Sequence, residues 1–387
     1  ISMNIIFRNQ LGFLSEFFHV LGVSTRDEKH FPEVIRREKV PMVEIEMTRS
    51  ISFLKDLKAL VRMIRLFQKE KPCIVHSHSP KAGLIAMVAA KITGVHIRLH
   101  TIAGMPLMEA KGLRRWILSL SERITYACAT ALFPNSQGLK KYLMENNLVN
   151  PSKVRIIGNG SSNGVDLEYF STSNFNNLTV LRKKVRKDWG LNENDFVFCF
   201  IGRLVKDKGL KELVEAFLKI IENNKKKSDN KNAKLLLIGP LVKGRDEPDS
   251  FTSKRIVDNQ DIIHVGRHDD IRPFLIAADV FVFPSYREGL PNAVLQAGAM
   301  GLPCIVSDIY GCNEIIIHGE NGLIVPPKNT ARLFEAMSSL INDENLRVKL
   351  ASNARPMIAS RYEQKAFLAE LLKTYKEYLK EANLVNE

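Results

Sequence analysis

Short runs of β-branched and aromatic residues alternate along the chain with longer stretches in which apolar residues recur every three or four positions. Runs of the first kind predict buried strands, and stretches of the second kind predict amphipathic helices. Alternation of the two favours parallel sheets that are built from βαβ units. In the first half, the predicted strands span residues 19–24, 41–47, 73–78, 96–101, 131–136 and 154–159, and the predicted helices span 51–69, 80–93, 109–127 and 136–146.

The pattern begins again after a segment, GNGSSNGVD at 158–166, that is rich in Gly, Ser and Asn and has no periodicity. Such a segment is typical of a linker or hinge. In the second half, the predicted strands span 196–203, 235–239, 262–266, 280–285, 304–308 and 323–326, and the predicted helices are one that Pro291 opens and those at 208–224, 330–341, 344–358 and 362–382.

These elements predict an α/β protein with two Rossmann-like, doubly wound domains that face an interdomain cleft. The expected domains are residues 1–160 and 161–365, followed by a C-terminal helix at 366–387 that packs back toward the first domain. In sheets of this kind ligands bind outside the carboxyl ends of the strands. Candidate functional residues are therefore expected in the loops that follow strands.

Composition excludes several classes of protein. Of 387 residues, 45% are hydrophobic and 25% are charged, which excludes wholesale disorder, collagen-like repeats and a disulfide scaffold. The five cysteines have neither metal-ligand nor CxxC spacing, so we expect no structural zinc and favour a reducing, cytoplasmic location. The sequence contains no run of about 18 apolar residues, so we expect no membrane-spanning helix. The start, ISMNIIF, does not have the pattern of a signal peptide.

Charge is distributed unevenly between the two halves. The net charge is +14, and residues 1–165 carry 24 Lys/Arg against 12 Asp/Glu, whereas the remainder carries 32 against 30. This asymmetry indicates that the first domain faces an anionic partner, such as a nucleic acid, an anionic membrane surface or a phosphorylated substrate. A plain gain in solubility is an equally open interpretation.

Three loops of the second half carry candidate chemistry. In IGRLVKDKGL (201–210), Gly202 and Arg203 follow a strand and Lys208 begins a helix, so that two cations and free helix N–H groups suit a diphosphate. In VGRHDDIRPFL (265–275), a strand that ends in glycine can offer its backbone to a nucleobase.

The remaining loop, within PSYREGLPNAVLQAGAMGLPCIVSD (284–308), joins a strand to a helix that Pro291 opens at its first position. The N–H groups of Leu290, Asn292 and Ala293 can receive an anion. Glu288 can accept hydrogen bonds from sugar hydroxyls. A carboxylate beside a phosphate pocket indicates a sugar phosphate as the ligand rather than phosphate alone.

Together these motifs make the sequence recognisable. The run from FIGRLVKDKG through PSYREGLPNAVLQAGAMGLPCIVSD to GCNEIIIHGENGLIVPP resembles retaining glycosyltransferases of family 4, which have the GT-B fold. In the first half, HSHSPKAGLIAMVAAKITGVHIRLHTIAGMP resembles the bacterial capsule and O-antigen branch, and NGSSNGVDLEYF is similar to the interdomain hinge. The start, ISMNIIFRNQLGFLSEFF, resembles the loop and helix that follow the family's first strand, so we expect that strand to be missing here.

The resemblance implies roles for individual residues. Arg203 and Lys208 would bind the donor diphosphate, and Glu288 would contact the donor sugar. The second carboxylate of the family's Glu-x7-Glu signature is replaced by Gln296, whose amide can still contact the ribose but without a carboxylate's charge. The donor pocket would further include Gly202, Gly289, Leu290, Pro291, Asn292 and Ala293, with Val265, Gly266 and Arg267 beside the base or ribose.

Other positions match the acceptor side of the family's site. His100 matches the His that lies at the sugar and the acceptor, so the implied catalytic set is His100, Glu288, Arg203 and Lys208. The acceptor side would also include His76, His78 and Thr101. Glu314, in GCNEII, matches a position near the donor pocket.

The resemblance implies retaining transfer of a hexosyl or N-acetylhexosaminyl group to a lipid-diphosphate-linked glycan in surface polysaccharide synthesis. The expected donor is a UDP-linked sugar, because UDP is the commonest nucleotide in this family. No metal and no cofactor besides the nucleotide sugar is expected, because no Asp-x-Asp pair is placed to hold a divalent ion. The segment KGLRRWILSLSERITY (111–126) suits a helix lying on the anionic cytoplasmic leaflet, which predicts a peripheral location there. A core-packed helix with a basic outer face is the other interpretation of this segment.

Three alternatives to a glycosyltransferase stay open. A sugar-nucleotide epimerase or phosphorylase shares the fold. A nucleic-acid-binding protein would fit the basic charge, although the sequence has no RRM, KH or helix-turn-helix signature. A non-catalytic, membrane-associated scaffold would fit the change to Gln296.

Overall fold

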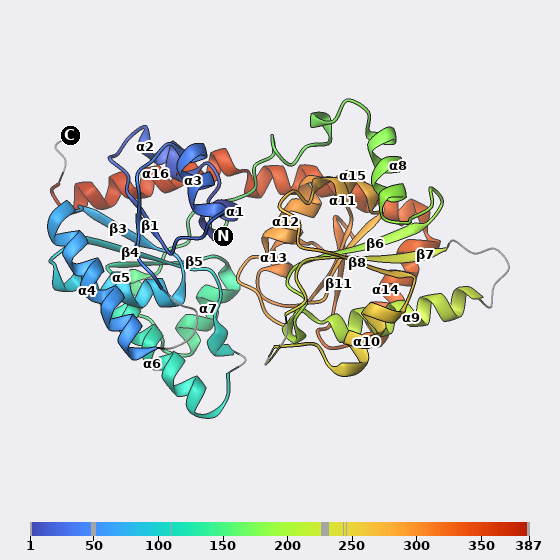
Figure 1. Ribbon diagram of the computed structural model, residues 1–387, viewed down its shortest axis with the longest axis horizontal. Coiled ribbons are helices and arrows are strands. Elements are labelled where there is room, and N and C mark those ends of the chain that lie inside the picture. The colour runs from blue at the N-terminus through green and yellow to red at the C-terminus, as the bar shows by residue number, and fades with distance from the viewer. Residues whose placement is uncertain are drawn as a thin grey trace. The chain divides into compact units, whose positions relative to one another are not determined.

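The computed structural model describes residues 2–47, 52–108, 110–225, 232–242, 244 and 246–384. The chain forms two compact units (Figure 1). Unit 1 combines residues 1–164 with residues 364–387, and unit 2 spans residues 165–363.

Unit 2 is built on a six-stranded parallel sheet with the order β11-β10-β9-β6-β7-β8 (Figure 1). The strands are β6 (Phe196–Ile201), β7 (Ala233–Ile238), β8 (Ile262–Gly266), β9 (Val280–Phe283), β10 (Cys304–Ser307) and β11 (Gly322–Val325). The chain runs outward from β6 to β8 and then returns to place β9 on the other side of β6. This reversal is the topological switch point of a doubly wound sheet, and in such sheets ligands bind outside the carboxyl ends of the strands at that point, here those of β6 and β9.

Helices cover both faces of this sheet. They are α8 (Leu178–Asp188), α9 (Leu210–Lys225), α10 (Ser250–Asp258), α11 (Arg272–Ala277), α12 (Asn292–Ala299), α13 (Cys312–Ile315), α14 (Thr330–Asn342) and α15 (Glu344–Tyr362). Helix α9 packs against α14, and α12 packs against α15. The strands are almost wholly buried, as the aromatic and β-branched run of β6 predicts: Phe198 and Phe200 are fully buried in the core.

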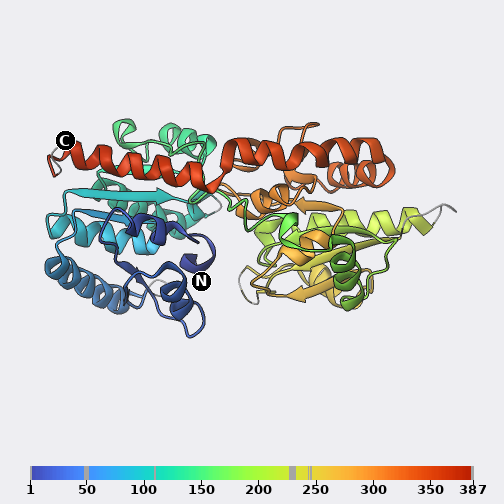
Figure 2. The same ribbon diagram turned by 90° about the horizontal axis from the view of Figure 1, so that it is seen from above.

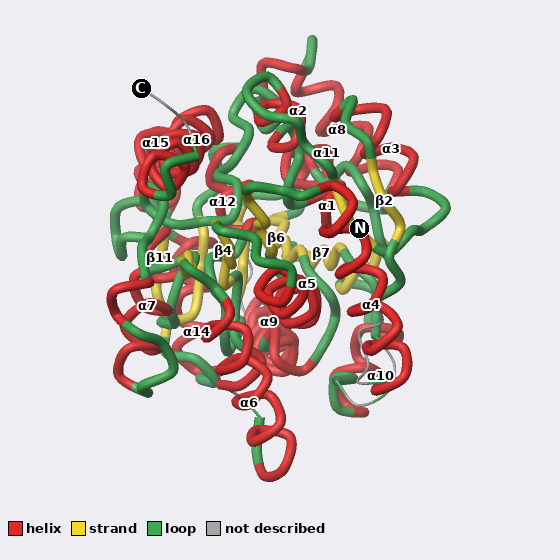
Figure 3. Tube along the Cα trace, turned by 90° about the vertical axis from the view of Figure 1, so that its left-hand side faces the viewer, coloured by secondary structure: helices red, strands yellow, loops and turns green. Residues whose placement is uncertain are grey.

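Unit 1 contains two separate parallel sheets. One has the order β3-β4-β5 and the other pairs β1 with β2, and Figure 3 shows β2 set apart from β4. The strands are β1 (Gly22–Ser24), β2 (Met42–Glu44), β3 (Ile74–Ser77), β4 (Ile97–Ile102) and β5 (Ala131–Pro134). The prediction of a strand at 154–159 is wrong, because only Val154 forms an isolated bridge, to Leu132.

The helices of unit 1 come from both ends of the chain. They are α1 (Ser2–Ile5), α2 (Gln10–Ser15), α3 (His30–Glu38), α4 (Phe53–Glu70), α5 (Pro80–Ile92), α6 (Gly112–Cys128), α7 (Gln137–Glu145) and α16 (Gln364–Glu381). Helix α16 lies along the strands of the β3-β4-β5 sheet (Figure 2), where Leu371 shares a core with Leu99 and Phe133. Helix α5 packs on β3 and β4 through a different cluster that includes Met87 and Val75.

The segment predicted as a linker is bonded into unit 1 over residues 158–164. Ser161, Ser162 and Asn163 are buried. Asn135 donates through Nδ2 to Ser162 Oγ at 2.9 Å, and Asn163 donates through Nδ2 to the Arg8 carbonyl at 2.9 Å. The boundary between the two units, from Gly164 to Val165, nevertheless falls inside the predicted linker segment. Its short polar side chains, which favour loops, also satisfy buried polar groups.

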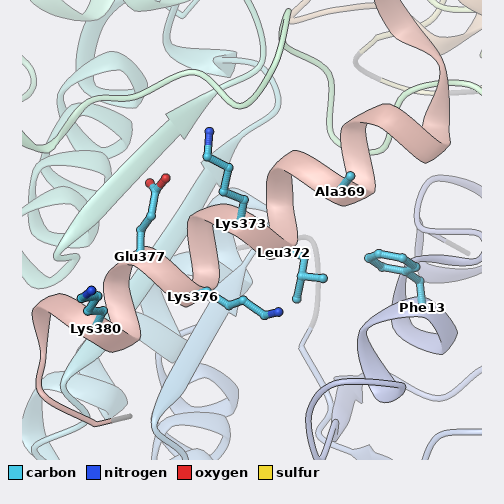
Figure 4. A pocket seen from close by; sticks show the side chains of 7 residues that line it. All are labelled: Phe13, Ala369, Leu372, Lys373, Lys376, Glu377 and Lys380. Atoms are coloured by element: carbon cyan, nitrogen blue, oxygen red, sulfur yellow. The ribbon is translucent and has the colours of Figure 1, made fainter. Parts of the chain in front are cut away.

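A surface groove of about 410 Å³ lies in unit 1 along α16 and beside α2 (Figure 4). Its lining residues are Phe13, Ala369, Leu372, Lys373, Lys376, Glu377 and Lys380. The predicted site residues are all elsewhere, so this groove is not the candidate active site.

Candidate active site

The candidate donor site lies where β6 and β9 end, at the switch point of the unit 2 sheet. Gly202 follows β6 and donates its N–H to the Ile238 carbonyl at 2.9 Å, which extends the ladder by one residue. A 3₁₀ turn at Lys206–Lys208 then leads into α9. Residues 284–291 leave β9 and lead into α12. The two motifs found in the sequence thus occupy neighbouring loops.

Gly209 brings the two loops into backbone contact. Its φ is +69°, and a Cβ there would lie 2.0 Å from the Pro284 carbonyl oxygen. Only glycine tolerates both the left-handed backbone and so close a neighbour. The glycine that follows Lys208 therefore sets the separation between Lys208 and the loop that carries Glu288.

Lys208 and Glu288 form an ion pair between Nζ and Oε1. Both side chains are mostly buried, 16% and 15% exposed. Ser285, which is fully buried, places Oγ 2.8 Å from the same Glu288 oxygen. Low exposure strengthens the attraction between the charges, because water screens them less. The two residues that the sequence assigned to the diphosphate and the sugar therefore meet at one point.

Helix α12 points its amino end into this region. It begins at Asn292, and Pro291 is its N-cap, so the prediction that Pro291 takes the first helical position is wrong by one residue. The first N–H groups of a helix, here those of Asn292 and Ala293, have no intrahelical acceptor and carry partial positive charge. Gly289 and Leu290 are buried in the turn that precedes them. The arrangement suits an anion.

The remaining predicted donor residues lie along the same edge of the sheet. Arg203 is exposed, and its side chain forms no hydrogen bond or ion pair with the described residues. Gln296 is half-buried one turn into α12. At the end of β8, buried Val265 precedes Gly266, whose carbonyl accepts the Gly239 N–H at 2.7 Å, and Arg267 lies 3.6 Å from Asp269.

His100 is a buried residue of β4, with 2% of its surface exposed. Its Nδ1 lies 2.8 Å from Ser77 Oγ. A Cβ at Gly83 of α5 would lie 2.4 Å from His100 Cε1, so the ring fits only because this position has no side chain. Burial lowers the pKa of His100 to about 4, which keeps the imidazole neutral near pH 7.

His76 and His78 lie side by side, with ring centroids 4.1 Å apart. His76 is held at both nitrogens: Nδ1 is 2.6 Å from Tyr375 Oη, and Nε2 is 2.8 Å from Thr101 Oγ1. Burial lowers the pKa of His78 to about 3 and that of His76 well below its usual value. His76 and Thr101 share one face of the sheet, whereas His100 faces α5 on the other, because neighbouring strand residues alternate.

Sequence reasoning missed Tyr375, and no local signal marks it, since it is one apolar position among many on α16.

Glu314 is half-buried on α13, and its backbone carbonyl accepts hydrogen bonds from Arg361 Nη1 at 2.8 Å and Tyr362 Oη at 3.0 Å. In the described part of the chain, no group of three or more His, Cys, Asp or Glu side chains is placed to hold a metal ion.

Comparisons with known proteins identify the family. The model for glycosyl transferases group 1 matches residues 182–357, and that for a glycosyl transferase 4-like domain matches residues 15–160. The capsular polysaccharide biosynthesis glycosyltransferase CapM of Staphylococcus aureus is 35% identical over 97% of this chain and 95% of its own length. The chain belongs to the group 1 glycosyl transferases. A second relative of this glycosyltransferase, UDP-Gal:alpha-D-GlcNAc-diphosphoundecaprenol alpha-1,3-galactosyltransferase of Escherichia coli, is 32% identical over 81% of the chain and 78% of its own length.

Solved structures agree on the fold of this glycosyltransferase. A crystal structure of Anabaena HepE in complex with UDP and glucose matches with a TM-score of 0.78 at 17% identity, over 95% of this chain and 94% of that one. A crystal structure of WaaG, a glycosyltransferase involved in lipopolysaccharide biosynthesis, matches with a TM-score of 0.70 at 14% identity, over 93% and 92%. The predicted GT-B fold and the resemblance to family 4 are confirmed.

Proposed function

We propose that this glycosyltransferase moves a hexosyl or N-acetylhexosaminyl group from a UDP-linked donor to a lipid-diphosphate-linked glycan, with retention of the anomeric configuration. The observation that carries the proposal is the placement of Lys208 and Glu288 beside the amino end of α12. A cation, a carboxylate and free N–H groups at one point match the diphosphate and the sugar hydroxyls of a nucleotide sugar.

In the proposed complex the donor diphosphate takes the place of Glu288 as the partner of Lys208. It is also contacted by Arg203 and by the N–H groups of Asn292 and Ala293. Glu288 is then free to accept hydrogen bonds from the sugar, while Ser285 Oγ still supports it at 2.8 Å. Gln296 contacts the ribose, and the backbone around Gly266 faces the base.

The proposed chemistry is stabilisation of a leaving diphosphate by fixed positive charge. Lys208, Arg203 and the α12 amino end would be preorganised where negative charge develops as the glycosidic bond breaks. These groups would do the work that a divalent ion does in other transferases, so we propose a metal-independent reaction. The acceptor hydroxyl would attack from the face that the diphosphate leaves, and a donor phosphate oxygen would take its proton. His100 and the pair of His76 and Thr101 are proposed on the acceptor side.

The proposed acceptor follows from the names of two relatives. CapM acts in capsular polysaccharide biosynthesis, and the Escherichia coli relative is named for a diphosphoundecaprenol acceptor. We propose that unit 1 attaches to the cytoplasmic face of the membrane through the basic surface of α6, and that such an acceptor reaches the site there. Its exposed Leu113 and Trp116, at 73% and 63%, support this attachment. Among the described residues, no helix has the length and apolarity that crossing a membrane requires.

The test is a turnover screen of UDP-sugars, with a polyprenyl-diphosphate-linked monosaccharide as acceptor and EDTA present. The expected product is an extended lipid-linked glycan whose new linkage is axial for an axial donor, as NMR of the anomeric proton reports. Isomerised UDP-sugar without transfer would indicate an epimerase, and phosphate-dependent release of a sugar phosphate would indicate a phosphorylase. An inverted linkage would contradict retention, and loss of turnover with EDTA would contradict metal independence.

A further inference from the structure

Two charged residues beside the Lys208–Glu288 pair have no part in the chemistry proposed so far. Asp207 precedes Lys208, and Arg287 precedes Glu288. Arg287 donates from Nη2 to Asp207 Oδ2 at 2.7 Å, and each side chain is 26% exposed. The ion pair therefore joins the loop that follows β6 to the loop that follows β9, one residue away from the groups that would hold the donor.

The backbone of Asp207 strengthens the same junction. Its carbonyl accepts the Tyr286 N–H at 2.9 Å and lies 3.3 Å from Ser285 Oγ. Tyr286 in turn donates its hydroxyl to Glu212 Oε2 of α9 at 2.6 Å. Three consecutive residues of the β9 loop are thus bonded to the turn and helix that carry Lys208.

These contacts matter because direct pairing between β6 and β9 ends at Cys199 and Phe281, two residues before each strand ends. Beyond that point the sheet cannot fix the distance between Lys208 and Glu288. A diphosphate and a sugar that are bound at once need both groups at set positions, and small displacements of such groups cost large factors in rate.

We infer that Asp207 and Arg287 are positioning residues that clamp the two donor loops together and so hold Lys208 and Glu288 in register for a nucleotide sugar. This inference rests on the proposed function for its activity readout. Neither side chain needs to touch the donor, and the pair acts as one unit.

The experiment compares Asp207→Asn, Arg287→Gln and the double variant. Each single change is expected to lower kcat/KM for the UDP-sugar by about 20-fold. The double change is expected to lower it by no more than about 30-fold, because either single change already removes the ion pair that the two residues share. Arg182→Gln is the matched control. It removes the ion pair Arg182–Asp279 at 2.6 Å, together with two hydrogen bonds from Arg182 to backbone carbonyls, from the opposite end of β9. Because the donor loops are not touched, it is expected to leave kcat/KM within twofold.

Hydrogen exchange provides a readout that needs no turnover. The amides of residues 285–288 are expected to exchange about tenfold faster in both single variants than in the wild type or in Arg182→Gln, while the melting temperature stays near that of the control. Arg287→Lys keeps the positive charge but replaces the planar guanidinium by an ammonium group. Its exchange rates are expected to fall between those of wild type and Arg287→Gln.

The outcomes separate the two proposals. Wild-type protein that transfers no sugar would overturn the proposed function, and the exchange measurement alone would then decide the clamp. An active wild type with unchanged exchange and unchanged kcat/KM in both single variants would overturn the clamp. Multiplicative losses in the double variant, or an equal loss in Arg182→Gln, would also overturn it, because either would indicate independent or general destabilisation.

Discussion

At the scale of single residues, the donor proposal depends most on Lys208. Lys208→Ala is expected to lower kcat/KM at least about 100-fold, roughly 2.7 kcal/mol, because it removes a mostly buried cation and leaves the Glu288 carboxylate unpaired. Steady-state kinetics with a saturating acceptor measures the loss. Lys206→Ala, an exposed lysine of the same turn, is the matched control and should retain activity. A loss below threefold in Lys208→Ala would remove Lys208 from the donor site.

The buried histidines of unit 1 make a prediction about acid stability. The pKa of His100 is lowered to about 4 by burial, whereas an unfolded histidine has a pKa near 6.5. Between these values the unfolded chain binds more protons, so stability is expected to fall as the pH falls from 6.5 toward 4, by up to about 1.4 kcal/mol per pH unit for each such group. His100→Gln should flatten this slope relative to wild type, and exposed His96→Gln should not. Equal slopes in melting temperature for all three proteins would contradict the neutral, buried state.

At the scale of elements, Gly209 tests whether the contact between the two donor loops is needed. Gly209→Ala would place a Cβ 2.0 Å from the Pro284 carbonyl at a φ of +69°. Gly190→Ala is an unusually close control, because its φ is +67° but nothing lies within 4 Å of its Cβ position. Both changes should cost about 1 kcal/mol in backbone strain. Only Gly209→Ala should also lower kcat/KM, by about tenfold or more, since it alone forces the loops apart.

Activity and unfolding measurements on this pair separate strain from displacement. Equal losses of activity in the two glycine variants would show that strain alone is responsible.

Sequence patterns predicted most elements of unit 2, and particular segments show why some elements were recognised and others were missed. The run FVFCFI of β6 is buried on both faces, so its composition alone identified it. Helix α8 was missed because its exposed surface is rich in lysine and arginine and shows few apolar positions. The prediction of a strand at 154–159 was wrong because a short apolar run does not reveal whether a neighbouring strand is available to pair with it.

The candidate site was predictable only where a motif is local. Lys208 and Glu288 were found in their loops, but their ion pair joins positions 80 residues apart, and the Asp207–Arg287 clamp is likewise long-range. The contact of His76 with Tyr375 joins residues 299 positions apart. Which face His100 takes depends on strand register, and no motif encodes that.

At the scale of the whole molecule, part of the basic charge of residues 1–165 lies on and beside α6, next to exposed apolar side chains. Leu113, Trp116, Leu120 and Ile124 form an exposed apolar stripe at helical spacing on this helix. Lys111 and Arg114 are exposed beside it, whereas Arg115 donates to the Leu107 carbonyl at 3.2 Å. An apolar stripe flanked by cations suits an anionic leaflet, because insertion of the apolar side chains and attraction to lipid phosphates add together.

Reversal of this charge should therefore separate membrane binding from catalysis. Lys111→Glu combined with Arg114→Glu is expected to reduce sedimentation with liposomes of anionic phospholipid at least about tenfold, since each surface cation contributes about 1 kcal/mol. Turnover of a short-chain, water-soluble acceptor should stay within twofold, because neither residue belongs to the candidate site. Lys184→Glu combined with Lys187→Glu makes the same change in charge on exposed positions of α8 in unit 2, and should leave liposome binding intact. Undiminished binding in the α6 variant would show that α6 does not attach the protein to the membrane, and an equal loss in the α8 variant would show that net charge alone controls binding.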